Sequence, residues 1–197
     1  MKEKLDKIFS NTIITLVENQ LELPDIKTIS INQDFFSEEF KVGFNKTQQS
    51  EYFNEQMSII KSSKGPTLYW FEFDNSKIDK NVLREKYCAY KNSFGKDYNN
   101  LLYRNTSSFK KNFDQVTNVL YVGKVETGFY SRIITHLGYA TNKGTAGMQL
   151  HHWYADEIKT YGDLTLNFIE FSPQMIYLIA LFEKLFAKEL KPLIGRY

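Results

Sequence analysis

The chain has 197 residues, of which 42% are apolar, enough for one domain with additions and a packed core. Its formal net charge is only +2, which is too small to indicate nucleic-acid binding by itself. The single cysteine, Cys88, excludes an internal disulfide framework, and the longest apolar run, residues 175–182, is too short for a membrane span of about 20 residues.

Two helices are predicted before the first strand. Residues 1–7 alternate in charge and lack the apolar centre of a signal peptide, so we expect a cytoplasmic protein without membrane contact. Apolar residues then recur at helical spacing through 3–22, and Pro24 ends that helix. A second helix is predicted over 48–63. We expect residues 1–64 to form an N-terminal helical appendage. Whether it covers a core face, forms a dimer or contacts substrate stays open.

Two β-rich runs follow, Thr67–Phe73 and Val119–Val125, both rich in aromatic and β-branched residues. Side chains alternate between the two faces of a strand. Tyr69 therefore lies on one face of the first run, and Tyr121 and Gly123 share one face of the second. We expect the two strands to pair as neighbours.

The two strands are separated by an insertion, residues 75–118. A structureless loop of that length is unusual in a compact domain, so we expect an ordered segment with a helix near 79–90. Residues 67–150 carry 12 Lys and Arg against 7 Asp and Glu. A local positive field suits a polyphosphate ligand, although a solvated face gives the same bias. Lys110 and Lys111 are the insertion residues that we expect to contact substrate.

The C-terminal part of the chain is predicted to contain a third strand between helices. The predicted segments are a helix at 128–137, a mobile loop at 139–150, a short helix at 151–161, a strand at 164–171 and a helix at 173–190. Ser172 followed by Pro173 is typical of a helix start. The predicted fold is therefore α+β, with a small three-stranded, mainly antiparallel sheet flanked by helices in a domain of residues 65–197.

Polar side chains on two of these helices suggest phosphodiester chemistry. Arg132 and His136 are four residues apart and share one helix face. A guanidinium grips a phosphate through two N–H donors, and an imidazole exchanges a proton near neutral pH. Glu183 lies on the apolar stripe of the last helix, where a carboxylate is costly unless it is paired or binds a metal. The ordinary alternatives are a surface Arg/His pair and a Glu183 that either snorkels to solvent or pairs with Arg132.

The ordered set of motifs resembles the GIY-YIG nuclease superfamily. The matching pieces are Tyr69 in Thr-Leu-Tyr, Tyr121 and Gly123 in Tyr-Val-Gly, Arg132, His136 one turn later, and Glu183 nine residues before Pro192. In that superfamily two strands carry the tyrosines, a helix carries the arginine, and a later helix carries a metal-binding glutamate. This chain lacks the first-motif glycine, separates the tyrosines by 52 residues and has Gly195 in the region where a late Asn is common.

The resemblance implies a metal-dependent endonuclease that hydrolyses DNA, of the restriction or phage-defence kind. The catalytic set that it implies is Tyr69, Tyr121, Arg132, His136, Glu183 and Lys124. Glu183 would hold a single Mg²⁺ or Mn²⁺. Tyr69, aided by His136 or Tyr121, would direct the attacking water, and the arginine and lysine of the set would stabilise the developing charge. A homodimer that cuts both strands is implied by analogy alone.

Two other functions stay open. The missing first-motif glycine is compatible with a catalytically inactive GIY-YIG fold that binds nucleic acid or protein. A structural subunit that assembles through residues 1–64 is the third reading. In the nuclease reading, Gly123 joins Lys110 and Lys111 as a substrate-binding position. The sequence leaves open the choice between DNA and RNA, the recognition site and which tyrosine is the general base.

Overall fold

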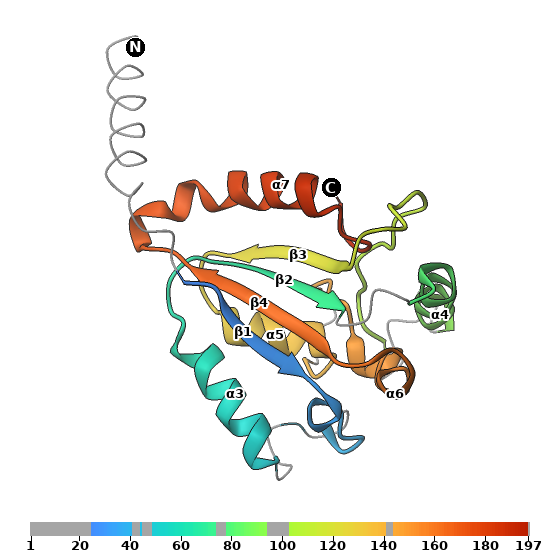
Figure 1. Cartoon of the computed structure of the whole chain (residues 1–197). Helices are drawn as coiled ribbons and strands as arrows, with labels where there is room; N and C mark the ends of the chain where they lie inside the picture. The colour runs from blue at the N-terminus through green and yellow to red at the C-terminus, as the bar shows by residue number, and fades with distance from the viewer. Residues whose placement is uncertain are drawn as a thin grey trace.

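The described part of the chain forms one four-stranded antiparallel sheet with helices on both faces (Figure 1). The computed structural model describes residues 25–40, 44, 49–73, 78–93, 103–140 and 144–196. The strands are β1 (Lys27–Ile31), β2 (Thr67–Phe73), β3 (Val119–Val125) and β4 (Leu164–Glu170), in the order β1-β4-β2-β3. The predicted helix at 3–22 lies outside the described residues, as do 75–77 and 94–102 of the insertion.

The α+β class and the pairing of the two tyrosine strands are confirmed, but the prediction of three strands is wrong. β1 is the fourth strand, and it pairs with β4 so that Lys27 lies opposite Phe168. Only Ile29 and Ile31 of β1 are buried. A five-residue strand with two buried side chains has too weak an alternation to be recognised in the sequence. The described part of the predicted appendage therefore contributes a strand to the sheet.

The described helices are of two kinds. The α-helices are α3 (Glu51–Ser62), α4 (Lys80–Ser93), α5 (Phe129–Leu137), α6 (Ile158–Tyr161) and α7 (Ile179–Leu190). The 3₁₀ helices are η1 (Gln33–Phe35), η3 (Leu150–His152) and η4 (Pro173–Tyr177). The predicted last helix is thus divided into η4 and α7, and the predicted helix at 151–161 is reduced to two short segments. No described helix has the length and apolar character needed to cross a membrane.

Capping residues explain where several helices begin and end. The Ser50 hydroxyl accepts a hydrogen bond from the N–H of Phe53 at 3.1 Å, which starts α3. The Asp79 carboxylate accepts from the N–H of Asn81 at 2.9 Å, which starts α4. Gly138 ends α5 in the left-handed region, with φ of 102°. Each boundary lies within three residues of its predicted place.

The sheet separates two hydrophobic layers (Figure 1). α7 packs on one face, over Leu68 and Trp70 of β2. α3 and α5 lie on the other face, over Tyr69 and Phe71. Because β2 is covered on both sides, all its residues except Glu72 are buried. The alternation of β2 therefore turns Tyr69 toward α5.

β3 forms one edge of the sheet, and the C-terminal tail covers part of that edge. The N–H of Leu193 donates to the carbonyl of Val119 at 3.0 Å, and the N–H of Ile194 donates to Leu120 at 2.9 Å. Within the described ranges, no segment pairs with this edge beyond Tyr121. The last residues of β3 are therefore an open edge of the described sheet.

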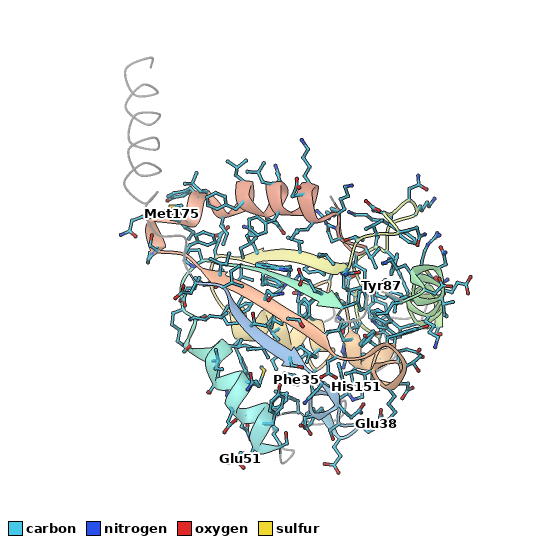
Figure 2. All side chains as sticks on the ribbon, viewed as in Figure 1. Phe35, Glu38, Glu51, Tyr87, His151 and Met175 are labelled. Atoms are coloured by element: carbon cyan, nitrogen blue, oxygen red, sulfur yellow. The ribbon has the colours of Figure 1, made fainter. Side chains whose placement is uncertain are left out.

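The described part of the insertion packs beside the C-terminal tail, near the start of β3. Tyr87 points inward from α4 (Figure 2), and its hydroxyl donates to the carbonyl of Ser107 at 2.7 Å. Phe109 forms an isolated bridge with Ile194, and the C-terminal tail thus lies between β3 and the insertion. The helix predicted near 79–90 of the insertion is present as α4.

Candidate active site

Four of the predicted catalytic side chains meet on the α5 face of the sheet. Arg132 donates from Nε to the hydroxyl of Tyr69 at 3.0 Å and from Nη2 to the hydroxyl of Tyr121 at 3.1 Å. His136 follows one turn later on α5, and its Nε2 lies 2.9 Å from the Tyr69 hydroxyl. Neighbouring strands and one helix thus bring the four residues together. We call Tyr69, Tyr121, Arg132 and His136 the tyrosine cluster.

Gly123 makes room for the tyrosine cluster. It lies opposite Tyr69 in the β2–β3 ladder. A Cβ atom at this position would lie 2.7 Å from the Tyr69 hydroxyl and 2.5 Å from Cε1 of Tyr121, closer than packed atoms approach. Both rings are buried, so neither can move aside freely. The glycine that the sequence predicts as a substrate-binding position therefore has a packing role in this structure.

The protonation of His136 follows from its two partners. The backbone N–H of Met148 lies 3.2 Å from Nδ1, and because an amide N–H only donates, Nδ1 must accept. Burial, together with the charge of Arg132, holds the pKa of His136 well below its usual value, so the ring is neutral at physiological pH. A neutral ring that accepts at Nδ1 carries its proton on Nε2 and donates it to Tyr69. His136 therefore has no nitrogen free to take a proton from Tyr69.

The hydroxyl oxygen of Tyr69 receives two hydrogen bonds, one from Arg132 and one from His136. Its side chain is fully buried. Burial, followed by repulsion from Tyr121, raises the pKa of Tyr69 well above its usual value, although Arg132 acts in the opposite direction. Tyr69 is therefore a neutral phenol at physiological pH. A general base would need the opposite shift of its pKa.

Arg132 links the two phenols and keeps donors for an anion. Its Nη1 donates to the carbonyl of Ala146 at 2.7 Å, so three of its five N–H groups are engaged within the described structure. Burial opposes the charge, but Tyr69 and Tyr121 hold the pKa of Arg132 above its usual value. Tyr121 retains 8% exposure, against 0% for Tyr69. The cluster thus places a permanent cation with two remaining donors beside the more exposed tyrosine.

Glu183 approaches this cluster from the other face of the sheet. α7 carries it, half-buried, to the open edge of β3, where the backbone N–H of Lys124 donates to its carboxylate. Burial raises the pKa of Glu183 above its usual value, while the charges of Lys124 and Arg132 act in the opposite direction. The carboxylate also contributes to the raised pKa of Tyr69. Glu183 therefore lies within electrostatic range of the tyrosine cluster, although it stands on the opposite face of the sheet.

Lys124 lies on the α7 side of β3, one residue along from Gly123, so the alternation of the strand separates it from the tyrosine cluster. Its ammonium forms an ion pair with Glu126 at 2.7 Å. Lys124 is also the largest charge acting on Glu183. The structure thus brings this predicted catalytic lysine to the carboxylate rather than to the phenols. No pattern in the sequence singles out Glu126.

The donor set suits a loosely held hard cation. Within the described ranges there is no group of three or more His, Cys, Asp or Glu residues that could enclose a metal ion. Glu183 offers one half-buried carboxylate near the charge of Arg132. Mg²⁺ commonly binds through one or two carboxylates and takes waters and phosphate oxygens as its other ligands. A single Mg²⁺ or Mn²⁺ shared with a phosphate fits this donor set.

The two lysines that the sequence predicts as substrate contacts lie outside the tyrosine cluster. Lys110 lines a groove against the C-terminal half of α7, and its backbone N–H donates to Leu193 at 2.9 Å. Lys111 is exposed and does not line that groove. Of the two, only Lys110 is therefore held in a defined surface feature.

Residues 144–149 support the tyrosine cluster and were not recognisable as functional from the sequence. In the described part of the predicted loop, Ala146 and Met148 bind the cluster through backbone groups. Gly147 permits the close approach to α5, since a Cβ atom there would lie 2.6 Å from the carbonyl of Thr135. Backbone contacts leave no residue-type signature. The glycine is the one local signal that could have indicated them.

No protein-family model matches the chain, and no curated protein and no solved structure shows significant similarity to it. A fold class alone does not identify a function, because one fold hosts many activities. The resemblance to GIY-YIG nucleases therefore rests on the motif residues of the sequence alone.

Proposed function

We propose that the protein is a metal-dependent endonuclease of the GIY-YIG type that hydrolyses phosphodiester bonds in DNA. The supporting observation is the hydrogen-bonded chain from His136 through Tyr69 and Arg132 to Tyr121, with the carboxylate of Glu183 at the adjacent strand edge. A fixed cation with free donors beside a carboxylate is suited to a phosphate and its metal ion. A restriction or phage-defence role and a homodimeric assembly are parts of the proposal that rest on the resemblance.

Arg132 binds the scissile phosphate in this proposal. Its two remaining N–H donors contact phosphate oxygens, and its charge stabilises the negative charge that develops in the transition state. Tyr69 and His136 are positioning residues, because Tyr69 accepts from Nε of the guanidinium and His136 in turn holds Tyr69. Both are fully buried and so act through Arg132 rather than on the substrate.

Tyr121 is the tyrosine that we assign to the attacking water. It is the more exposed of the two, and within the described structure its hydroxyl oxygen accepts one hydrogen bond, from Arg132. One lone pair and the hydroxyl proton are therefore available to a water molecule. The resemblance implies Tyr69 for this step, whereas the Tyr69 oxygen already accepts two hydrogen bonds in a dry environment.

Glu183 is the residue that would hold the metal ion. A Mg²⁺ or Mn²⁺ ion bound by this carboxylate would supply Lewis-acid chemistry at the phosphate. The backbone N–H of Lys124 orients the carboxylate. Since burial raises the pKa of Glu183, protons compete with the ion more strongly than at an exposed glutamate, and acidification weakens metal binding.

A second function is favoured by the full burial of Tyr69, which a purely structural core would also show. It is a GIY-YIG fold that binds nucleic acid without cutting it. In that case Glu183 and Arg132 hold the phosphate backbone, and no water is activated. Binding without hydrolysis distinguishes this function from the first.

Supercoiled plasmid incubated with the purified protein and Mg²⁺ or Mn²⁺ tests the proposal. We expect nicked or linear product with the wild type, and none with EDTA or with Glu183→Gln. Glu189→Gln is the matched control, because Glu189 is exposed on the same helix and should cut like the wild type. Equal cutting by Glu183→Gln would show that the activity lies elsewhere. Retained DNA binding without cutting in either metal would favour the binding module.

A further inference from the structure

A basic groove lies beside the C-terminal half of α7, just beyond the candidate active site. It is lined by residues 110 and 112–114 of the insertion, by Ala187 and Lys188 of α7, and by Lys191, which follows the end of α7. In Figure 1 the insertion segment before β3 rises beside the end of α7. We call this feature the lysine groove.

The charges of the lysine groove are only partly balanced. Lys191 forms an ion pair with Asp114 at 2.9 Å, which ties α7 to the insertion. Within the described ranges neither Lys110 nor Lys188 has an ion-pair partner. Lys110 is partly buried, and burial lowers its pKa. Because a partly desolvated ammonium is costly without an opposite charge, the groove is suited to an anion.

Backbone contacts hold the walls of the groove in place. The N–H of Lys110 donates to the carbonyl of Leu193 at 2.9 Å. The hydroxyl of Thr117 donates to the carbonyl of Leu190 at 2.8 Å, at the end of α7. These bonds place Lys110 opposite the last turns of α7 before any ligand arrives. Less ordering entropy is therefore lost on binding than with a free loop.

The groove continues the positive side of the candidate site along α7. Ala187 follows Glu183 by one turn on the same helix face, and Lys188 lies about 7.5 Å beyond Glu183 along the helix axis. In duplex DNA each strand carries one phosphate per roughly 3.4 Å of duplex axis, so a further phosphate of the same strand can lie within this distance of the one at Glu183. Lys184, whose charge acts on Glu183, lies between them. A strand with one phosphate at Glu183 can therefore follow α7 into the groove.

We propose that the lysine groove binds the phosphodiester backbone of duplex DNA next to the scissile phosphate, with Lys110 and Lys188 each contacting a phosphate. The inference rests on the proposed function, since it assigns the path of the same substrate. Lysine is a compact charge on a flexible stem, which suits contacts to the backbone without readout of the bases. The groove therefore contributes affinity and register rather than sequence choice.

Binding of a labelled, random-sequence DNA duplex to the Glu183→Gln protein tests the groove without cutting. Lys110→Gln and Lys188→Gln are introduced one at a time, and affinity is measured between about 50 and 200 mM salt. We expect each variant to reduce the slope of log affinity against log salt by about 1. Lys159→Gln is the matched control, because Lys159 is exposed on α6, away from α7 (Figure 1), and should leave the slope unchanged.

Unchanged slopes in both groove variants would overturn the inference, provided that thermal melting shows them folded. Lys110→Arg restores the charge and should restore the slope. A reduced slope with duplex RNA but not with duplex DNA would overturn the assignment to DNA. Plasmid cutting by the wild type separates the two proposals. If the wild type cuts but the groove variants keep the wild-type salt slope, only the proposal of the groove is overturned. A wild-type protein that neither cuts plasmid nor binds DNA would overturn both the groove and the proposed nuclease function.

Discussion

Tyr69 and Gly123 lie opposite each other in the β2–β3 ladder, and the tyrosine hydroxyl takes the space that a side chain at position 123 would fill. The position of Tyr69 in the first motif therefore requires a residue without a side chain at position 123 in the second motif. Arg132 then fixes the hydroxyl at 3.0 Å from its Nε atom. The glycine is thus a condition for the cluster to form, independently of any contact with substrate.

Gly123→Ala should disrupt the candidate site. The added Cβ would displace both tyrosine rings, and a misplacement of about 1 Å can reduce a catalytic rate by about 100-fold. Overpacking should also lower the free energy of unfolding by about 1–3 kcal/mol. Val122→Ala is the control, since Val122 is buried against α7 on the other face and should lose stability but keep most of the cutting rate. Wild-type cutting by Gly123→Ala would contradict this role.

The tautomer of His136 is directly measurable. Met148 donates to Nδ1, so long-range proton–nitrogen NMR spectra should show His136 protonated at Nε2 and unprotonated at Nδ1. Because burial lowers its pKa, the ring should stay in this form at pH values below about 6.5, the usual pKa of histidine. A proton on Nδ1, or an ordinary titration, would contradict the positioning role of His136.

Stability should fall on mild acidification because His136 is buried in its neutral form. Its folded pKa is lowered, so the unfolded chain takes up a proton first as pH falls. The contribution is fully present above about pH 6.5 and is lost as the pH falls from there toward the folded pKa. His136→Gln should remove this part of the dependence. Denaturant unfolding measured from about pH 7 to about pH 5 gives the free energy of unfolding of the wild type and of His136→Gln at each pH. An equal change of this free energy with pH in both proteins would contradict the prediction.

The two tyrosines should separate into a structural and a chemical role. Tyr69→Phe leaves the donors of Arg132 and His136 without their acceptor in a buried place, and should lower the free energy of unfolding by about 1–3 kcal/mol. Tyr121→Phe removes one hydrogen bond at a less buried position and should lose less stability. If Tyr121 directs the water, its variant should lose the cutting rate even where fully folded. Wild-type cutting by Tyr121→Phe would return this role to Tyr69.

Side-chain patterns predicted the site better than they predicted its supports. Tyr69, Tyr121 and Arg132 meet because strand and helix periodicity determine their faces, and periodicity is readable in sequence. Backbone partners such as Met148 leave no such record, because every residue type except proline supplies a backbone N–H. The ion pair of Lys124 with Glu126 depends on rotamers that no sequence pattern encodes. The residue types of the tyrosine cluster were therefore predictable, whereas their protonation states required the structure.

The fourth strand leads to a prediction about the N-terminal segment. Removing residues 1–64 takes away β1 and α3, whose side chains Ile29, Ile31 and Phe53 are buried in the main core. It also exposes the edge of β4, and an unpaired strand edge promotes aggregation. We expect residues 65–197 alone to be insoluble or to lack a cooperative thermal transition.

Removing residues 1–24 alone is the control for this deletion, because every described element remains. Near-ultraviolet circular dichroism during heating distinguishes the outcomes, since a packed aromatic core gives a signal that a loosened core loses. Cooperative melting and plasmid cutting by residues 65–197 would show that the first 64 residues are a separable unit. Suppose that the protein without residues 1–64 loses cooperative melting and plasmid cutting, whereas the protein without residues 1–24 keeps them. That result would show that β1 and α3 complete the domain that holds the tyrosine cluster.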